Sequence, residues 1–227
     1  MIPDDPRIHV VRRAHTGHVG TARQEGLERS SGQYVVFQDS DDRSSADRLQ
    51  RQVLALERTP EAGWCHGDYV MIDESGGTIP RRAGRPWQPR TGDVLHEILT
   101  TEASIALQTM LIRRELAQAI GFDRRMAFGD DYDFTIRLAA RAPACAVSGV
   151  VAEFREHAGR ASHVRCDQSL DMALAYWKCR GTLRDPALRR VCRQRAWSLF
   201  RHYAARARRS VGVVEGLRQV RARLRRA

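Results

Sequence analysis

The chain has 227 residues, 42% of them hydrophobic, and a formal net charge of +11, which suits one domain of ordinary size with an appendage. Its five cysteines are scattered and form no C-x-x-C pair, which argues against a disulfide framework or a zinc site and fits a reducing cytosol. Nothing resembles a signal peptide or the roughly 20 apolar residues of a membrane span, so we expect a cytoplasmic protein, at most peripheral at the inner face of the plasma membrane.

The first segment of the chain predicts a strand, a helix and a second strand. Residues 7–13 contain three β-branched residues, enough for a short strand, and a glycine-containing loop follows. Residues 21–29 are typical of a helix that ends at Ser30-Ser31-Gly32. Residues 34–37 are four consecutive strand formers and predict a buried strand. Together these elements predict a βαβ unit.

The most informative segment is the acidic turn, residues 38–44, which follows this strand and carries Asp39, Asp41 and Asp42. Ligands bind at the carboxyl ends of strands in open α/β sheets. Carboxylates this close repel one another unless a cation lies among them, and Mg²⁺ or Mn²⁺ accepts one or two carboxylates together with phosphate oxygens. The acidic turn therefore predicts a metal-bound nucleotide. The alternative is an acidic turn in which Asp42 or Ser44 merely caps the next helix.

The middle of the chain predicts further strands and helices around this turn. We expect a hairpin turn at residues 73–77 and an irregular loop at 78–90 that could form one wall of a site. Gly121 should end the last helix of this part. The expected helices cover residues 45–58, 92–99 and 113–120, and the expected strands cover 64–72 and 103–112.

A second acidic cluster, Asp130, Asp131 and Asp133, opens a helix whose inward face carries apolar residues. One aspartate there is explained by helix capping and by the helix macrodipole. Three in four residues exceed what capping needs, and burial beside another carboxylate raises a pKa toward the range of a general base. This cluster is therefore a candidate for catalysis as well as for capping.

Taken in order, these motifs resemble glycosyltransferase family 2, and the resemblance covers about residues 7–163. It implies an α/β fold of the GT-A (Rossmann-like) type, a mixed sheet flanked by helices, in a domain of residues 1–163. Outside the resemblance, residues 164–227 are expected to form a basic amphipathic helical tail. The matching segments are Thr21-Ala22-Arg23-Gln24 with Gly26-Leu27, residues 32–42, Gly121-Phe122-Asp123, residues 129–133, Arg137-Leu138, and Phe154-Arg155-Glu156-His157 with Ser162.

The resemblance also implies a role for each acidic residue. Asp39, Asp41 and Asp42 stand at the family's D-x-D type motif, so they would hold Mg²⁺ or Mn²⁺ against the diphosphate of a nucleotide sugar and touch its ribose. Asp130 and Asp131 match the family's Glu-Asp pair. Asp131 would be the general base that deprotonates an acceptor hydroxyl, and the reaction would invert the anomeric carbon.

Three basic residues complete the implied site. Arg155 and His157 match a segment that reaches back to the pyrophosphate in relatives, where a cation or imidazole would neutralise charge. A surface histidine without such a role is the alternative for His157. Arg23 matches the arginine of the family's Ala-Arg-Asn motif and is expected at the substrate, whereas Gln24 replaces the usual asparagine.

The start of the chain departs from the family pattern. Members normally begin with a strand, a helix and a second strand whose acids grip the nucleotide base, and this chain begins at what resembles the third strand. We therefore expect an N-terminally truncated GT-A domain. Three explanations stay open, namely a truncated gene product, a start codon placed too late, and a domain completed by another chain.

The tail is the basic part of the chain, because residues 164–227 hold 17 Lys and Arg against 4 Asp and Glu. Its apolar residues recur at helical intervals and predict two or three amphipathic helices. Residues 211–227 place apolar side chains on one face and arginines on the other, which is compatible with an anionic membrane surface. Trp177 and Trp197 could instead dock the helices onto the catalytic domain. Solvated helix faces are the alternative for the charges.

Two classes of function follow. The favoured one is an inverting, metal-dependent glycosyltransferase that moves a sugar from a nucleotide-sugar donor to a hydroxyl of a glycan, lipid or protein acceptor, with a role in cell-envelope polysaccharide biosynthesis. The other is a catalytically incomplete fragment that binds a sugar nucleotide or a polyanion. Nucleic acid is disfavoured as a partner, because aromatic residues are not interleaved with the basic patch. A glycosidase is also disfavoured, because it needs no metal.

Overall fold

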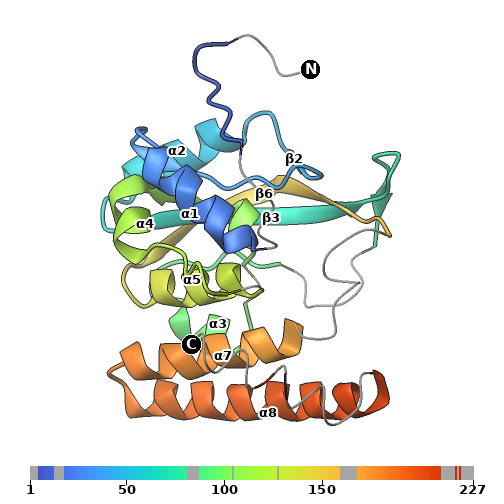
Figure 1. Ribbon diagram of the computed structural model, residues 1–227. Helices are drawn as coiled ribbons and strands as arrows, with labels where there is room; N and C mark the ends of the chain where they lie inside the picture. Colours follow the sequence, from blue (N-terminus) through green and yellow to red (C-terminus); the bar gives the residue numbers. More distant parts are fainter. Residues whose placement is uncertain are drawn as a thin grey trace.

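The computed structural model describes residues 5–12, 18–80, 87–103, 105–126, 128–158, 168–210, 218 and 220. A twisted mixed sheet lies in the middle of the molecule, with helices on both faces and a long helical pair stacked below (Figure 1). The strand order is β1-β5-β3-β6-β2, and β4 pairs with β3. The strands are β1 (Tyr34–Val35), β2 (Arg43–Ser44), β3 (Trp64–Ile72), β4 (Thr78–Ile79), β5 (Leu111–Arg113) and β6 (Ala144–Arg155).

The helices pack as two layers on the sheet. On one face, α2 covers a cluster that contains Leu56, Cys65 and Cys145. On the other face, α1, α4 and α5 pack on Trp64 and Ile112. Trp64 and Cys65 are neighbours in β3, so the alternation of a strand supplies both cores. The helices are α1 (Val19–Arg29), α2 (Arg48–Arg58), α3 (Leu95–Thr100), the 3₁₀ turn η1 (Leu107–Thr109), α4 (Arg114–Ile120), α5 (Asp130–Ala139), α7 (Gln168–Thr182) and α8 (Pro186–Ser210).

Most of the expected elements are present, with shifted ends. The helices over residues 21–29 and 113–120 and the strand over 64–72 are confirmed, and Gly121 ends α4 with a φ of +59°. The turn after β3 is a hairpin, because β4 returns antiparallel to β3. The expected strand over 103–112 is instead η1 followed by the short β5.

Two expectations about strands are wrong, and one strand of the sheet was not predicted. Residues 7–12 form no strand, so no βαβ unit precedes the acidic turn in residues 5–12 and 18–35, and residue 13 lies outside the described residues. The strand before the acidic turn covers only two residues and stands at one end of the described sheet, paired with β5 alone. The longest strand, β6, was not expected, and it runs parallel to β3 beside it.

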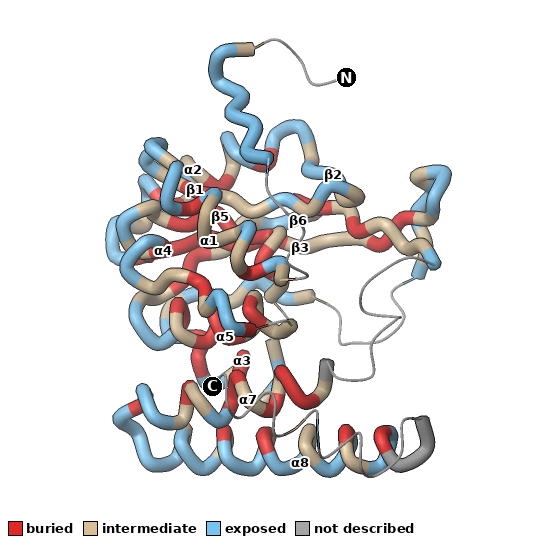
Figure 2. The backbone as a smooth tube through the Cα atoms, in the orientation of Figure 1, coloured by how far each residue is buried: buried red, intermediate tan, exposed pale blue. Residues whose placement is uncertain are grey.

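Of the two or three helices expected in the tail, the described residues contain two, α7 and α8, and both contribute to the main core. The cluster that contains Trp64 also contains Tyr176 and Cys179 of α7, Leu183 directly after α7, and Cys192 and Ala196 of α8. Figure 2 shows the buried side of both helices turned toward the rest of the molecule and the outer side of α8 exposed. The division of the chain at residue 163 stays a prediction.

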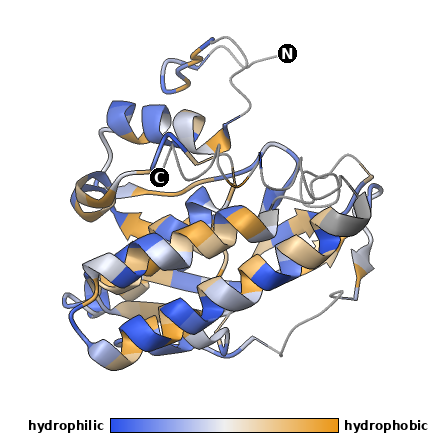
Figure 3. Ribbon diagram, turned by 60° about the horizontal axis from the view of Figure 1, so that its bottom comes forward, coloured by the Kyte–Doolittle hydropathy of each residue, from blue (hydrophilic) through white to orange (hydrophobic). Residues whose placement is uncertain are grey.

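The structure rules out one of the two alternatives for the tail. Trp177 and Trp197 do not dock the helices, because they are 42% and 54% exposed. Figure 3 turns the α7–α8 pair to the front and shows polar and apolar residues alternating along both helices. Most of residues 211–227 lies outside the described residues, but Val220 packs on Leu170 and Tyr203. No helix in the described part of the chain is both long and apolar enough to cross a bilayer.

Candidate functional site

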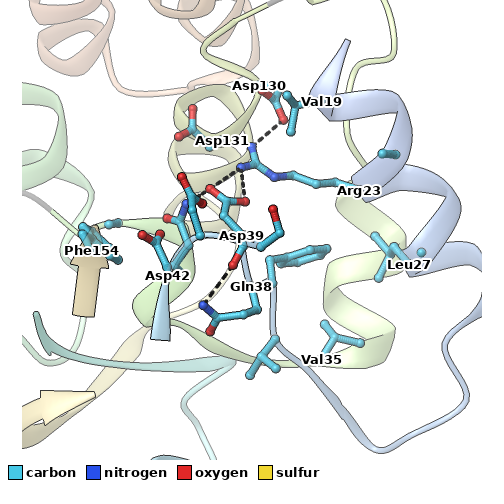
Figure 4. A pocket seen from close by; sticks show the side chains of 18 of the residues that line it. Val19, Arg23, Leu27, Val35, Gln38, Asp39, Asp42, Asp130, Asp131 and Phe154 are labelled. Carbon is cyan, nitrogen blue, oxygen red and sulfur yellow. Dashed lines mark hydrogen bonds and ion pairs between the residues drawn. The ribbon is translucent and has the colours of Figure 1, made fainter. Parts of the chain in front are cut away.

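A cavity of about 1020 Å³ lies where α1, the acidic turn, η1 and the start of α5 meet (Figure 4). Six of the predicted site residues line it together, although they come from three separate segments of the chain. They are Arg23, Asp39, Asp41, Asp42, Asp130 and Asp131. The structure therefore brings the two acidic clusters to one cavity.

Arg23 joins the two acidic clusters. Its Nη1 donates to Asp130 Oδ2 at 2.9 Å, and its Nη2 donates to Asp39 Oδ1 at 3.2 Å. Gln108 of η1 donates from Nε2 to the other oxygen of Asp39. In Figure 4 the arginine reaches from α1 toward Asp39, with Asp130 turned to it from the other side. A cation and an amide thus hold Asp39 in a fixed place in the cavity wall.

Asp130 is the most perturbed carboxyl group of the site. Burial, together with the nearby charge of Asp131, raises its pKa to about 6 against the opposing attraction of Arg23. Burial alone would lower the pKa of Arg23, but the surrounding carboxylates outweigh it and raise that pKa. Gly20 lets α1 approach closely, because a Cβ there would lie 3.0 Å from Asp130 Cβ.

Asp131 lies beside Asp130 at the start of α5, and it also lines the cavity. Gly129 precedes the pair with a φ of +66°, a left-handed conformation that turns the chain into the helix. The next residue, Tyr132, is anchored at its hydroxyl, which donates to Ile98 O at 3.0 Å and lies 2.6 Å from the hydroxyl of Tyr176 in α7. The tail therefore helps to fix the helix that carries Asp131.

The other two acids of the turn have partners from β6 and beyond. His157 Nε2 lies 2.9 Å from Asp41 Oδ2, and the backbone N–H of Arg155 donates to Asp42 Oδ1 at 2.9 Å. The guanidinium of Arg155 donates to the carbonyls of Asp41, Asp73 and Glu74 at 2.9–3.1 Å. Neither Arg155 nor His157 is among the residues that line the cavity. Their expected contact with a pyrophosphate stays a prediction.

The three acids of the turn do not form a ready-made metal cage. Among the described residues, no group of three His, Cys, Asp or Glu side chains converges closely enough to hold a metal ion. Asp39 is engaged by Arg23, Asp41 by His157 and Asp42 by the Arg155 backbone. This geometry fits an ion that takes one or two carboxylates and completes its shell with substrate oxygens and water, which is how Mg²⁺ usually binds.

Neither the contact of Gln108 with Asp39 nor the close approach of α1 at Gly20 is visible in the sequence alone. Gln108 lies in a segment that was expected to be a strand, and a lone glutamine carries no chemical signature. Gln24, which replaces the family's asparagine, accepts from the backbone N–H of Phe122 at 2.6 Å and donates to Glu28 at 2.9 Å. It therefore ties α1 to the loop after α4 instead of reaching the cavity.

Sequence comparison places relatives of this chain among glycosyltransferases. Two relatives are TuaG of Bacillus subtilis, a glycosyltransferase ascribed to teichuronic acid biosynthesis, and AmsB of Erwinia amylovora, an amylovoran biosynthesis glycosyltransferase. TuaG is 30% identical over 112 residues, which are 49% of this chain and 42% of TuaG. AmsB is 29% identical over 119 residues, which are 51% of this chain and 39% of AmsB. The chain thus matches less than half of the length of each.

Structural comparison supports the same fold. The crystal structure of residues 1–349 of Staphylococcus aureus TarS in complex with UDP-GlcNAc superposes with a TM-score of 0.58 at 16% identity, covering 86% of this chain and 55% of that one. The structure without ligand gives a TM-score of 0.54. The expected GT-A fold class is confirmed by this likeness, and a family model described as glycosyl transferase family 2 matches residues 1–121. The chain belongs to glycosyltransferase family 2.

Proposed function

We propose that the cavity is the donor site of a glycosyltransferase that moves a sugar from a nucleotide sugar to a hydroxyl group of a glycan, lipid or protein acceptor. The observation that carries this proposal is the bridge of Arg23 between Asp130 and Asp39, in a cavity that Asp131 also lines. The cavity thereby contains a fixed cation, Arg23, that can bind a diphosphate, and a carboxylate, Asp131, that can accept a proton. Membership of the family supports the same reaction.

In this reaction Asp131 is the general base. Its carboxylate takes the proton of the acceptor hydroxyl as that oxygen forms a bond to the anomeric carbon. The bond between the anomeric carbon and the diphosphate oxygen breaks, and its electron pair leaves with the diphosphate. Attack from the side opposite the leaving group inverts the anomeric carbon. Arg23 contributes positive charge near the diphosphate, where negative charge develops.

We further propose that Mg²⁺ or Mn²⁺ binds at the acidic turn, through one or two of Asp39, Asp41 and Asp42. When bound, the ion would supply Lewis-acid stabilisation of the leaving diphosphate. The separate partners of the three acids favour a site that is completed by the donor's oxygens over one preformed by protein alone. Binding of the metal and of the nucleotide should therefore depend on each other.

The relatives suggest a donor and a pathway. The TarS structure contains UDP-GlcNAc, so a uridine diphosphate sugar is the first donor to try. TuaG and AmsB are named for the biosynthesis of teichuronic acid and amylovoran, so we propose cell-envelope or extracellular polysaccharide as the acceptor class.

The test compares wild type with two variants in Mn²⁺ and UDP titrations followed by thermal shift. Wild type should be stabilised only when both are present, and Asp41→Ala should lose that stabilisation. Asp131→Asn should retain it but lose about 10²–10⁴-fold in sugar transfer from UDP-GlcNAc. Asp185→Asn, at an exposed helix start far along the chain, is the control. Transfer by Asp131→Asn at the wild-type rate would contradict the role of the base.

A second function remains open, a binding module that holds a sugar nucleotide without turnover. The observation that favours it is the engagement of Asp41 by His157 and of Asp42 by the Arg155 backbone, which competes with a metal for both acids. This version predicts that UDP-GlcNAc binds without Mn²⁺ and is recovered intact after long incubation with any acceptor. Release of UDP that requires Mn²⁺ would exclude it.

We also propose that the outer face of α8 contacts an anionic membrane surface, near lipid-linked acceptors. Arg190, Arg193, Trp197 and Arg201 recur at three- and four-residue intervals, and all four are exposed. Wild type should sediment with phosphatidylglycerol vesicles and not with phosphatidylcholine vesicles, and Arg193→Glu with Arg201→Glu should weaken the sedimentation. Equal sedimentation of the variant would contradict the contact.

A further inference from the structure

Arg48, in the first turn of α2, is a buried cation outside the cavity. Its side chain is among the largest that are fully buried, with 1% of the residue exposed. Burial lowers its pKa to about 10, so the guanidinium stays charged at neutral pH. Among the described residues no carboxylate forms an ion pair with it. A buried charge is tolerated only when it forms hydrogen bonds. The hydrogen-bond acceptors of Arg48 therefore show which segments of the chain it binds.

The partners of Arg48 belong to two different loops beside the cavity. Nη1 donates to Ser44 Oγ at 2.9 Å and lies 3.5 Å from Gln38 Oε1, and both residues belong to the acidic turn. Nη2 donates to the carbonyl of Met110, directly after η1, at 3.0 Å. Nε donates to Gln52 Oε1, one helical turn further along α2, at 3.0 Å.

Gln52 extends the same network. It is fully buried, and its Nε2 donates to the carbonyl of Thr109, the last residue of η1, at 2.8 Å and to that of Cys65 in β3 at 3.3 Å. Arg48 and Gln52 thus bind consecutive carbonyls, those of Thr109 and Met110. One face of α2 holds the end of η1 at two points.

The two loops that α2 holds meet again inside the cavity. Gln38 precedes Asp39 in the acidic turn, and Gln108 precedes Thr109 in η1. Gln108 donates to Asp39, the acid that Arg23 also binds. Hydrogen bonds from α2, made outside the cavity, therefore fix the distance between the acidic turn and η1.

We propose that Arg48 and Gln52 are positioning residues, which set the acidic turn and η1 at the separation that the nucleotide site requires. This proposal rests on the proposed function for its effect on ligand binding, but not for its effect on the two loops. Neither residue lines the cavity, so both act through the loops that they hold. The oxygens that accept hydrogen bonds from Arg48 and Gln52 are all uncharged. The separation of the two loops therefore depends on the directions in which the two side chains donate, and not on charge pairing.

Hydrogen exchange followed by mass spectrometry tests the loops without any ligand. Arg48→Met should accelerate exchange in peptides that cover residues 38–44 and 107–110. Gln52→Glu keeps an acceptor for Arg48 Nε but loses the donor to Thr109, so exchange should rise at 107–110 and not at 38–44. This second variant keeps the proposal testable if Arg48→Met fails to fold. Unchanged exchange at 107–110 in folded Gln52→Glu would overturn the proposal.

Arg51→Met is the matched control, on the same helix. Arg51 donates to the carbonyls of Ser148 and Val150 at 2.7 and 2.6 Å, so it holds β6 and the bend within it. Its loss should accelerate exchange near 148–150 and leave 107–110 unchanged. If Arg51→Met loosened residues 107–110 as much as Arg48→Met does, the effect would be a general loosening of α2, and the proposal would fail.

Binding of UDP with Mn²⁺, measured by calorimetry, tests the consequence for the site. We expect Arg48→Met to weaken binding at least tenfold and Arg51→Met to change it less than twofold. Arg48→Lys keeps the charge without the forked donors, so it should not restore binding. Wild-type binding by Arg48→Met, or full rescue by Arg48→Lys, would overturn the proposal. If wild type binds no nucleotide, the proposed function fails, and the exchange data alone decide the role of α2.

Discussion

Replacing Asp130 by asparagine should make the protein more stable at neutral pH. The amide has nearly the same shape and still accepts a hydrogen bond from Arg23, which now donates to Asp130 at 2.9 Å. What changes is the charge, which burial opposes. Asp130 is 3% exposed, and burial raises its pKa from 3.8 to about 6. An ionised carboxylate in that place therefore costs folding free energy.

The size of the effect follows from linkage. A pKa near 6 in the folded protein, against 3.8 when unfolded, corresponds to roughly 3 kcal/mol at pH values above both. Between pH 4 and 6 the folded protein binds more protons than the unfolded chain, so wild-type stability falls as the pH rises through that window. Because Arg23 loses one of its carboxylates in Asp130→Asn, we expect a gain of about 1–3 kcal/mol at pH 8. The gain should vanish near pH 4.

Urea unfolding followed by circular dichroism at several pH values between 4 and 8 measures this gain. Asp185→Asn removes an exposed aspartate at a helix start and controls for the change in net charge. If Asp130→Asn were less stable than wild type at pH 8, attraction to Arg23 would outweigh burial, and the reasoning would be refuted. A difference that did not change between pH 4 and 8 would refute it as well.

Two further predictions concern the packing around the site. Gly20→Ala should cost about 1–3 kcal/mol of unfolding free energy, because its Cβ would lie 3.0 Å from Asp130 Cβ. Gly26→Ala in the same helix is the control, because its Cβ would meet nothing within 4 Å, and it should stabilise the protein by up to about 1 kcal/mol. A similar loss of unfolding free energy in both variants would contradict the contact between Gly20 and Asp130. Tyr176→Phe should cost about 1 kcal/mol in urea, since it removes the hydroxyl 2.6 Å from that of Tyr132, and an unchanged midpoint would show that this bond contributes nothing.

Local chemistry made the two acidic clusters predictable. Asp39, Asp41 and Asp42 fall within four residues, so their repulsion is visible in the sequence itself. The long-range contacts that hold these acids in place cannot be predicted in the same way. His157 lies 116 residues from its partner Asp41, and Arg23 lies 107 residues from Asp130. Such contacts depend on how strands and helices pack, which spacing along the chain does not encode.

In the tail, the buried and exposed faces of a helix differ by a single position in the sequence. Docking of α7 and α8 through Trp177 and Trp197 is one of the two alternatives that the sequence leaves open for the tail. The buried residues are their neighbours Tyr176 and Ala196. Adjacent residues of a helix point about 100° apart, so a shift of one position exchanges core for solvent. Exposed Trp177 is instead covered by the guanidinium of Arg180, 4.0 Å from its ring centre.

Strand β6 was not predicted because its apolar and polar residues do not alternate regularly, and its pairing with β3 explains why. Its residues alternate poorly, because the pairing of β3 with β6 contains register shifts near Gly67 and Gly149. Gly149 has a φ of +83°, and a Cβ on Gly67 would lie 2.5 Å from Val151. The shift between Asp68 and Tyr69 offsets the pairing by one residue, so it moves the following side chains of β6 to the other face and interrupts the two-residue period.

The anchoring of α5 by α7 bears on when the protein becomes competent during synthesis. A ribosome that has released residues 1–163 has made every acid of the cavity, yet Tyr132 still lacks Tyr176, and Asp123 lacks Lys178, whose Nζ lies 2.5 Å from it. The part of α5 that packs on α7 then faces water until α7 and α8 emerge. The start of α5, which carries Asp130 and Asp131, should therefore become fixed only near the end of translation, and a chaperone that shields α5 would be needed most in that interval.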